Sequence, residues 1–278
     1  QLAFKKSVTA IKYLPERCLS SIRISKYINN VEENEDGLLV RYGSRAKKIP
    51  NKIKLDHNFG YFIGAYLSEG HANDGQISIS NMDDNFISNI KDFIGNINLD
   101  YKEEINSRGF ALSRDFKISS SLLSQFIKSV CGSGSEKKIV PDFAYSAREE
   151  FVSGLLRGYF DGDANFTVDR KMIRVSTNSK ELRDGIALLL NRFRIFSYKT
   201  KDKKHQYWLL IPYKYVPLFL QYIGSDIEYK RKSLEKLNEL SKNYWNEKSR
   251  DFTDMVSGFE DLFYKISRKL GMRTRYVN

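Results

Sequence analysis

The hydrophobic pattern of this chain occurs twice. Two helix-length apolar stretches, GYFIGAYLSEG (60–70) and FVSGLLRGYFDGDA (151–164), are each followed by an alternating segment, ISIS (77–80) and IRVS (173–176). Apolar residues spaced three to four apart predict a helix, and alternation predicts a strand with one buried face. We therefore expect the chain to contain the same helix–strand unit twice.

The later elements keep the same order in both halves. The offset is 94 residues where Glu69 is aligned with Asp163 (163 − 69), and it drifts by a few residues to 92 in the closing segments (224 − 132). Each half continues with an amphipathic helix, further strand patterns, another helix and a closing segment of glycine and lysine. These lie at 83–97, 110–119, 122–130 and 132–141 in the first half, and at 179–193, 205–213, 216–224 and 224–233 in the second. The pattern predicts an α+β fold of two αββαββα repeats related by a pseudo-twofold axis.

Extensions flank the two repeats. We expect an N-terminal extension at 1–55, the first repeat at 56–148, the second at 149–245 and a basic helical extension at 246–278. Within the last segment, SGFEDLFYKISRKLGM (257–272) has apolar residues on one helical face. That helix is expected either to contact DNA or to pack on the protein with a solvated basic face.

Composition narrows the class of protein. Of 278 residues, 41% are hydrophobic and 29% are charged, which is typical of a globular chain. No stretch approaches the ~20 apolar residues of a membrane span, and the start lacks the pattern of a signal peptide. Together with only two cysteines, Cys18 and Cys131, this indicates an intracellular protein, most simply in a prokaryotic cytoplasm.

Charge points to the class of partner. The chain has 46 basic and 34 acidic residues, a formal net charge of +12. Such a surface suits nucleic acid or an anionic membrane surface, although an inert basic surface fits the number equally well.

Small residues inside the two apolar helices need a reason, because glycine in a helix interior costs about 1 kcal/mol relative to alanine. Gly64 and Ser68 lie one turn apart in the first helix, as Gly158 and Gly162 do in the second. Small residues at this spacing let two helix backbones approach closely. We therefore expect the two helices to pair along these faces.

Each small-residue stripe is followed directly by an acid. If the helices pair, Glu69 and Asp163 emerge side by side, where their repulsion favours a bound cation. A hard divalent ion such as Mg²⁺ is commonly held by one or two carboxylates and completes its shell with phosphate oxygens. On a chain of charge +12 the phosphate would belong to nucleic acid, which predicts metal-assisted phosphodiester hydrolysis.

FIGAYLSEG (62–70) and LRGYFDGDA (156–164) resemble the two nine-residue signatures of a single-chain LAGLIDADG homing endonuclease. Glu69 and Asp163 fall on the eighth position, which binds metal in that family, and Asp161 falls on the sixth. The first copy departs at the sixth position, where it has Leu67, and the second ends in Ala164 instead of glycine.

The resemblance implies a fold and an activity. Two curved antiparallel sheets would form a saddle along the major groove of double-stranded DNA, and the acids would cut both strands across the minor groove. The ion would be Mg²⁺ or Mn²⁺, with Ca²⁺ binding without supporting cleavage, and one chain would act as a monomer. The family's basic residue near each active site falls on Lys138 and Lys230, with Lys137 and Lys232 as alternatives.

Alternate residues on the strands are expected to face the DNA, and a basic strand turn is expected to meet phosphates. The basic turn has an alternative interpretation, in which it serves only solubility. The candidates are Ser78, Ser80, Arg114, Lys117, Arg174, Ser176, Lys199, Lys201, Lys203 and Lys204.

Other functions remain open at this stage. The same fold would serve an RNA maturase or a non-cleaving DNA-binding protein, and a basic scaffold protein is a further alternative. The resemblance is closest to the endonucleases of archaeal inteins, although a free-standing intron-encoded origin is compatible with it. We expect no self-splicing, because residue 1 is Gln, no TxxH block is present, and Val277 precedes Asn278.

Overall fold

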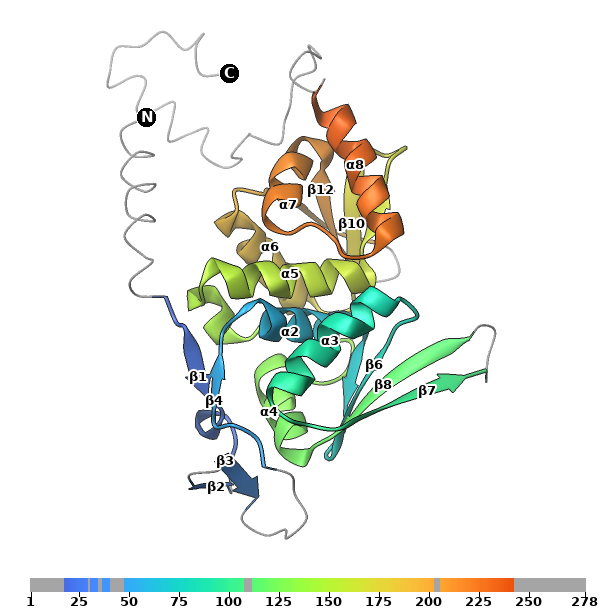
Figure 1. Cartoon of the computed structure of the whole chain (residues 1–278). Helices are drawn as coiled ribbons and strands as arrows, with labels where there is room; N and C mark the ends of the chain where they lie inside the picture. The colour runs from blue at the N-terminus through green and yellow to red at the C-terminus, as the bar shows by residue number, and fades with distance from the viewer. Residues whose placement is uncertain are drawn as a thin grey trace, which may run out of the picture. The chain divides into compact units, whose positions relative to one another are not determined.

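Two copies of one αββαββα unit make up most of the fold, in the predicted order (Figure 1). The computed structural model describes residues 18–29, 31–34, 37–40, 48–107, 112–202 and 206–242, all within a compact unit that ends at Lys242. The first copy consists of α2 (His57–Glu69), β5 (Gly70–Ala72), β6 (Gln76–Ser80), α3 (Asp84–Asn96), β7 (Tyr101–Asn106), β8 (Ser113–Ser119) and α4 (Ser121–Cys131). The second consists of α5 (Glu149–Asp163), β9 (Asn165–Thr167), β10 (Met172–Thr177), α6 (Lys180–Arg192), β11 (Tyr198–Lys201), β12 (Tyr207–Pro212) and α7 (Val216–Tyr222).

Elements outside the repeats include two short two-stranded sheets near the N-terminus. They are β1 (Ser21–Arg23) with β4 (Lys52–Lys54) and β2 (Val31–Asn34) with β3 (Gly37–Val40), and η2 (Ile24–Lys26) follows β1. A bridge from Leu19 to Ala147 joins this part to the segment between the repeats. Three further helices are η3 (Asp142–Ser146), η4 (Tyr213–Tyr215) and α8 (Glu228–Lys242). The C-terminal extension predicted at 246–278 lies outside the described residues.

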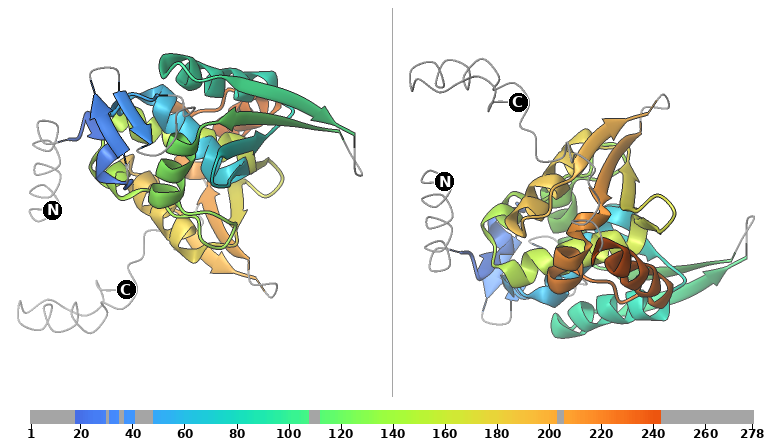
Figure 2. Two further views of the ribbon diagram at one scale, coloured as in Figure 1. Left: turned by 90° about the horizontal axis from the view of Figure 1, so that it is seen from below. Right: turned by 90° about the horizontal axis from the view of Figure 1, so that it is seen from above.

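Each repeat contributes a four-stranded antiparallel sheet with the same topology. The strand orders are β5-β6-β8-β7 and β9-β10-β12-β11. One face of each sheet is apolar and buried under helices, as Ile77 and Ile79 of β6 and Ile173 and Val175 of β10 illustrate. No helix within the described ranges covers the other face, and the two sheets extend from the helix pair as two arms (Figure 2).

Local sequence signals begin most of the helices. The side chains of Asp56, Asp83, Ser120 and Ser179 accept hydrogen bonds from backbone amides in the first turns of α2, α3, α4 and α6. These N-caps satisfy donors that a helix start leaves unpaired, and each contributes about 1 kcal/mol. Capping therefore fixes where the helices begin, independently of the core.

The two signature helices, α2 and α5, pack against each other at the centre of the molecule (Figure 1). A methyl group on Gly64 would lie 2.0 Å from the carbonyl oxygen of Leu155, and one on Gly158 would lie 2.3 Å from that of Tyr61. Gly60 and Gly154 make equivalent approaches, to Phe151 O and His57 O. The reciprocal contacts are those of a twofold axis, and their order shows that the helices run in the same direction.

We call this contact the glycine seam: Gly60, Gly64, Ser68, Gly154, Gly158 and Gly162. The sequence analysis had singled out Gly64, Ser68, Gly158 and Gly162, and the structure adds Gly60 and Gly154. Both additions lie one turn before a predicted member, at the same offset of 94 (154 − 60). Gly60, Gly64, Gly154 and Gly158 meet the backbone of the other helix, so no side chain can be inserted at these positions without moving the helices apart.

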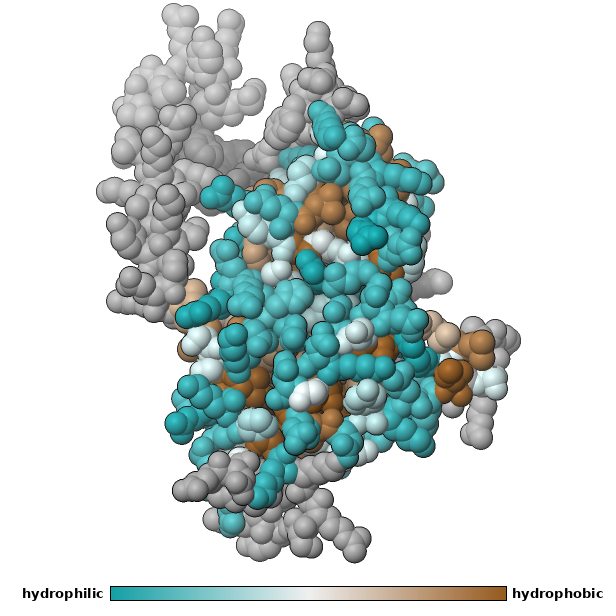
Figure 3. All heavy atoms as spheres, in the orientation of Figure 1, coloured by the Kyte–Doolittle hydropathy of each residue, from teal (hydrophilic) through white to brown (hydrophobic). Residues whose placement is uncertain are grey.

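The face of the molecule drawn in Figure 3 is mainly polar. Hydrophilic residues dominate it, and apolar residues form small patches between them. Among the described residues, no helix combines the length and the apolar character needed to cross a bilayer.

Replacing Gly64 with alanine tests the seam. The added methyl group would overlap a backbone carbonyl, so we expect Gly64→Ala to lower the free energy of unfolding by at least ~3 kcal/mol, or to prevent folding. The matched control is Gly95→Ala in α3, where nothing lies within 4 Å of the new methyl group. That control should raise the unfolding free energy by up to about 1 kcal/mol. Chemical denaturation followed by circular dichroism measures both, and equal effects would contradict the seam.

Candidate active site

The glycine seam ends at two acids. Glu69 is the last residue of α2 and Asp163 is the last residue of α5, and the parallel helices bring both to the same end of the pair. A methyl group on Gly162 would meet Ser68 Oγ at 2.1 Å and Glu69 Cγ at 3.2 Å, so the last turns are in direct contact. Asp163 is open to solvent and Glu69 is half-buried.

Two buried lysines lie beneath these acids. Lys138 Nζ donates to the carbonyl oxygens of Leu67 and Ser68 at 3.1 and 3.4 Å. Lys230 Nζ donates to those of Phe160 and Gly162, both at 3.1 Å, and also to that of Asp161. The lysines thus occupy the negative ends of the two helix dipoles, where a cation is stabilised.

The alternatives to these lysines point elsewhere. Lys137 is exposed, and Lys232 forms an ion pair with Glu228 on the surface of α8. Lys138 and Lys230, by contrast, are only 7% and 3% exposed. The structure therefore brings Glu69, Asp163, Lys138 and Lys230 together and leaves their sequence neighbours outside.

The four groups perturb one another electrostatically. Loss of hydration and, to a smaller extent, the charge of Glu69 together raise the pKa of Asp163 to about 6, against the opposing effect of the two lysines. Burial also raises the pKa of Glu69. Burial lowers the pKa of Lys230 to about 8 and shifts that of Lys138 downward as well, although the neighbouring acids oppose both shifts.

The free acid oxygens suit a divalent cation. Among the described residues, neither carboxylate has a hydrogen bond or an ion pair, and burial raises the pKa of both. Two carboxylates are a usual protein contribution to a Mg²⁺ site, with water and phosphate oxygens as the remaining ligands. No group of three or more His, Cys, Asp or Glu side chains able to hold a metal occurs in the described ranges. The geometry thus fits a metal shared with a phosphate ligand.

Asp161 serves a different purpose from the two outer acids. It is 1% exposed and accepts hydrogen bonds from Tyr61 Oη at 3.0 Å, Ser225 Oγ at 2.5 Å and the Asp226 amide at 3.2 Å. Burial raises its pKa to about 6. Its counterpart in α2 is the apolar Leu67, so the two halves of the site differ below the surface.

A pocket opens beside Glu69 only a short distance from the helix ends. It has a volume of about 460 Å³ and is lined by Glu69, Ser80, Asn81, Met82, Asp83, Asp161, Gly162, Ile227 and Tyr229. Met82 and Tyr229 are 53% and 66% exposed. The centre is therefore accessible to a large ligand.

Five predicted DNA-contacting residues lie on the faces of the sheets that no helix covers. In the first sheet these are Ser78, Ser80 and Lys117. They alternate along their strands with the buried Ile77, Ile79 and Phe116, so their side chains lie on the other face. In the second sheet they are Arg174 and Ser176, which alternate along β10 with the buried Ile173 and Val175. Lys117 is held by Glu104, whose pKa the lysines at 102 and 117 lower to about 2.

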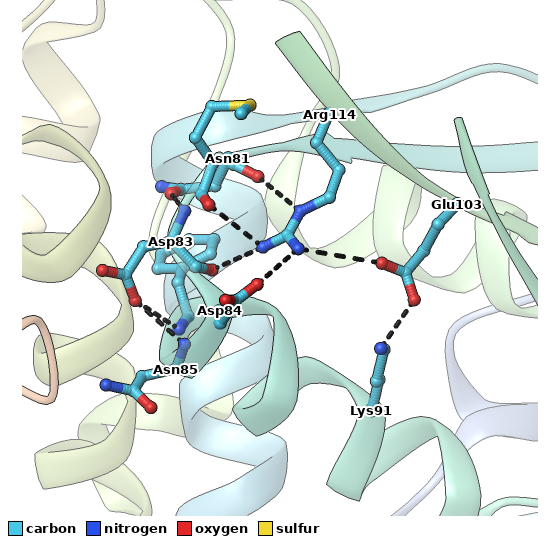
Figure 4. Close-up of polar contacts among 9 residues, drawn as sticks. Asn81, Asp83, Asp84, Asn85, Lys91, Glu103 and Arg114 are labelled. Carbon is cyan, nitrogen blue, oxygen red and sulfur yellow. Dashed lines mark hydrogen bonds and ion pairs between the residues drawn. The ribbon is translucent and has the colours of Figure 1, made fainter. Parts of the chain in front are cut away.

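Arg114 was wrongly assigned to the open face. It lies three residues before Lys117, so alternation turns it to the helix side. There its guanidinium binds the carboxylate of Asp84 at 2.6 Å and the carbonyl oxygens of Asn81, Met82 and Asp83 (Figure 4). Arg114 therefore fastens the start of α3 to the sheet.

Two lysines predicted for a basic strand turn lie in strand β11. Lys199 is paired with the buried Leu209 and Lys201 with Tyr207, and both lysine side chains are exposed. Their contact with phosphates stays a prediction. Lys199 Nζ lies 3.4 Å from Asp184 of α6. Lys203 and Lys204, in the turn that follows, lie outside the described residues.

Sequence reasoning missed the aromatic character of the second open face. Trp208 and Leu210 of β12 share the register of Ser176 and Arg174, and the Arg174 guanidinium stacks 4.7 Å from the Trp208 ring. In β11 the residues of this face are Tyr198 and Thr200. Strand alternation counted from the buried Leu209 would have found them.

The raised pKa of Asp163 predicts a pH-dependent stability effect. Its folded value of about 6 lies above the unfolded value of 3.8, so its stabilising contribution is complete below about pH 4 and is lost as the pH rises through 6. We expect Asp163→Asn to unfold about 2–4 °C above the wild type at pH 7 and to lose this advantage near pH 4. Glu104→Gln is the control of opposite sign, because the pKa of Glu104 is depressed. Melting curves across this pH range measure both, and a pH-independent gap for Asp163→Asn would refute the assignment.

Known proteins share sequence with this chain over most of its length. It is 42% identical to the DNA-directed RNA polymerase subunit Rpo1C of Methanocaldococcus jannaschii over 272 residues, which is 97% of this chain and 31% of that protein. It is 28% identical to the probable translation initiation factor IF-2 of the same organism, over 70% of this chain and 17% of the factor. The chain thus spans less than a third of the length of these relatives.

The family and the fold agree with each other. Residues 150–241 match the family model described as the LAGLIDADG-like domain. The crystal structure of I-DmoI in complex with DNA and Ca superposes with a TM-score of 0.51 at 15% identity, covering 65% of this chain and 98% of I-DmoI. At this level of identity the likeness shows a shared fold. The chain therefore has the LAGLIDADG fold, and its residues 150–241 match the LAGLIDADG-like domain.

Proposed function

We propose that this protein is a site-specific endonuclease that cuts both strands of double-stranded DNA with a divalent metal ion. The observation that carries the proposal is the meeting of Glu69 and Asp163 at the end of the glycine seam, above two buried lysines. Few structural needs explain two unpaired acids with raised pKa values at one helix junction, whereas active sites commonly have such groups.

Glu69 and Asp163 would hold Mg²⁺ or Mn²⁺, and Ca²⁺ would occupy the site without supporting cleavage. When bound, the metal supplies Lewis-acid stabilisation of the charge that develops on the phosphate. The glycine seam fixes the separation of the carboxylates, so that they are positioned before DNA arrives. Ionisation of the two carboxylates, which reaches half near pH 6 for Asp163, would set the pH at which the site is competent.

Lys138 and Lys230 would stabilise charge on the phosphate and take part in proton transfer. As ammonium groups they place positive charge beside the scissile phosphates, in a partly dehydrated site where electrostatic stabilisation is strong. Because its pKa is lowered to about 8, Lys230 Nζ is also able to exchange a proton near neutral pH. Either role makes the two lysines catalytic residues together with the two acids.

The open sheet faces would bind the DNA. The formal charge of +12 favours a polyanion, and the uncovered faces present hydroxyl, basic and aromatic side chains at alternate positions. We keep Ser78, Ser80, Lys117, Arg174 and Ser176 as proposed contacts and add Trp208. The open faces of both arms would make a saddle along the major groove, with the acids facing the minor groove between them.

The relatives support an origin as a mobile insertion. Their names describe an RNA polymerase subunit and a translation initiation factor, activities that have nothing in common, and this chain matches only a limited part of each. A segment shared by such different proteins is most simply an insertion that moves between genes. We therefore propose that the chain is the endonuclease part of an intein, acting on DNA inside the cell.

Cleavage is tested on a plasmid library of random inserts with Mg²⁺. We expect the wild type to linearise a subset of plasmids, and Glu69→Gln and Asp163→Asn each to lower the rate by at least about 10³-fold while DNA affinity is retained. Sequencing the ends gives the target site. A wild type that binds duplex DNA and cuts no member would favour the alternative, a maturase or a non-cleaving DNA-binding protein.

The stoichiometry of the complex is a separate prediction. Because one chain already contains both acids and both sheets, we expect one chain per DNA site. Sedimentation velocity of the complex with the recovered target measures this. Two chains per duplex would contradict the prediction, and salt-insensitive association would point to a basic scaffold protein instead, since phosphate contacts weaken steeply with salt.

A further inference from the structure

The chain segment that carries each buried lysine is hydrogen-bonded to the other repeat. Lys230 follows the loop between α7 and α8, and this loop is bound by α3 of the first repeat. Asn89 Nδ2 donates to Asp226 Oδ2 at 2.9 Å, and Asn85 Nδ2 donates to Asp226 O at 3.1 Å. The segment that delivers Lys230 is thus connected to the repeat that carries Glu69.

The same loop is held from its own side by α5. Arg157 Nη1 donates to Asp226 Oδ1 at 3.2 Å, and Arg157 Nε donates to Ile223 O. Asp161 accepts from Ser225 Oγ and from the Asp226 amide, and Tyr61 of the first repeat donates to the same carboxylate. Asp226 is the point at which these bonds from α3 and α5 meet.

Lys138 shows the mirror arrangement with different chemistry. Ser179, the N-cap of α6 in the second repeat, donates its hydroxyl to Lys138 O at 2.7 Å and accepts from the Leu182 amide at 3.1 Å. Asn178 adds a longer bond of 3.4 Å to Ser135 Oγ. Here the start of the middle helix of the second repeat holds the lysine of the first.

We infer that Asn89 with Asp226 and, in the other half, Ser179 are positioning residues for the lysines, each fixing the lysine of one repeat from the middle helix of the other. The inference rests on the proposed nuclease function. The two lysines depend on separate bonds with no shared residue, so each can be disturbed alone. A defect at one lysine should therefore appear on one DNA strand.

Cleavage of each strand tests this in the full chain. The target recovered from the plasmid library is labelled on either strand and cut under single-turnover conditions, and Lys230→Met and Lys138→Met identify the strand that depends on each lysine. Asn89→Ala should slow the strand that depends on Lys230 by about tenfold or more and change the other by less than about twofold. Ser179→Ala should do the reverse, and Ser179→Thr, which keeps the hydroxyl, should restore the rate.

The control variant is Asn96→Ala, which removes an exposed asparagine at the other end of the same helix α3 and should leave both rates unchanged. Melting curves exclude loss of fold as the cause, because Ser179→Ala also removes an N-cap. Equal slowing of both strands by Asn89→Ala would overturn the inference while leaving the nuclease function intact.

A second measurement does not depend on cleavage. The titration of the Lys138 and Lys230 side chains is followed by carbon-13 NMR of their Cε groups. Asn89→Ala should move the midpoint of Lys230 upward, towards that of a solvated lysine, and leave Lys138 unchanged; Ser179→Ala should do the opposite. If both or neither lysine responds to Asn89→Ala, the inference is wrong. If the wild type cuts no DNA, the nuclease function fails and this titration alone decides the inference.

Discussion

The close approach of two parallel helices is the constraint on which the rest of this structure depends. Glycine at four positions lets α2 and α5 touch backbone to backbone, with would-be methyl contacts of 2.0–2.3 Å to carbonyl oxygens. The parallel direction makes both helices end at the same place. Had the seam contained ordinary side chains, the helix axes would stand further apart and the two terminal acids would no longer share one site.

This arrangement creates an electrostatic problem that the lysines offset. Two helix C-termini and two carboxylates gather negative charge in one place, and antiparallel packing would have avoided it. Lys138 and Lys230 neutralise the helix ends from beneath by binding the last carbonyl groups, which leaves the carboxylates free above. The negative charges of the two carboxylates are therefore left without a paired cation on the side that faces solvent, where a metal ion and a phosphate would enter.

The two halves are alike in topology but not in the details that hold them together. One lysine is positioned through the carboxylate of Asp226 and the network of the buried Asp161, and the other through the hydroxyl of Ser179. The first sheet carries paired charges at Lys117 and Glu104, and the second carries Arg174 stacked on Trp208. A single chain is free to diverge in this way, whereas a dimer of identical repeats is not.

The sequence by itself determined the duplicated αββαββα order, and it predicted the small-residue faces and the acids Glu69 and Asp163, because periodicity and a nearly constant offset are local properties of the chain. Lys138 and Lys230 came from the resemblance to the LAGLIDADG endonucleases, with Lys137 and Lys232 as alternatives that the structure leaves at the surface. Only the tertiary structure decided which strand residues face outward, because a one-residue change in register exchanges the two faces, as Arg114 shows. The bonds from Asn89 to Asp226 and from Ser179 to Lys138 were equally out of reach, since they join residues 137 and 41 positions apart whose meeting depends on how the repeats dock.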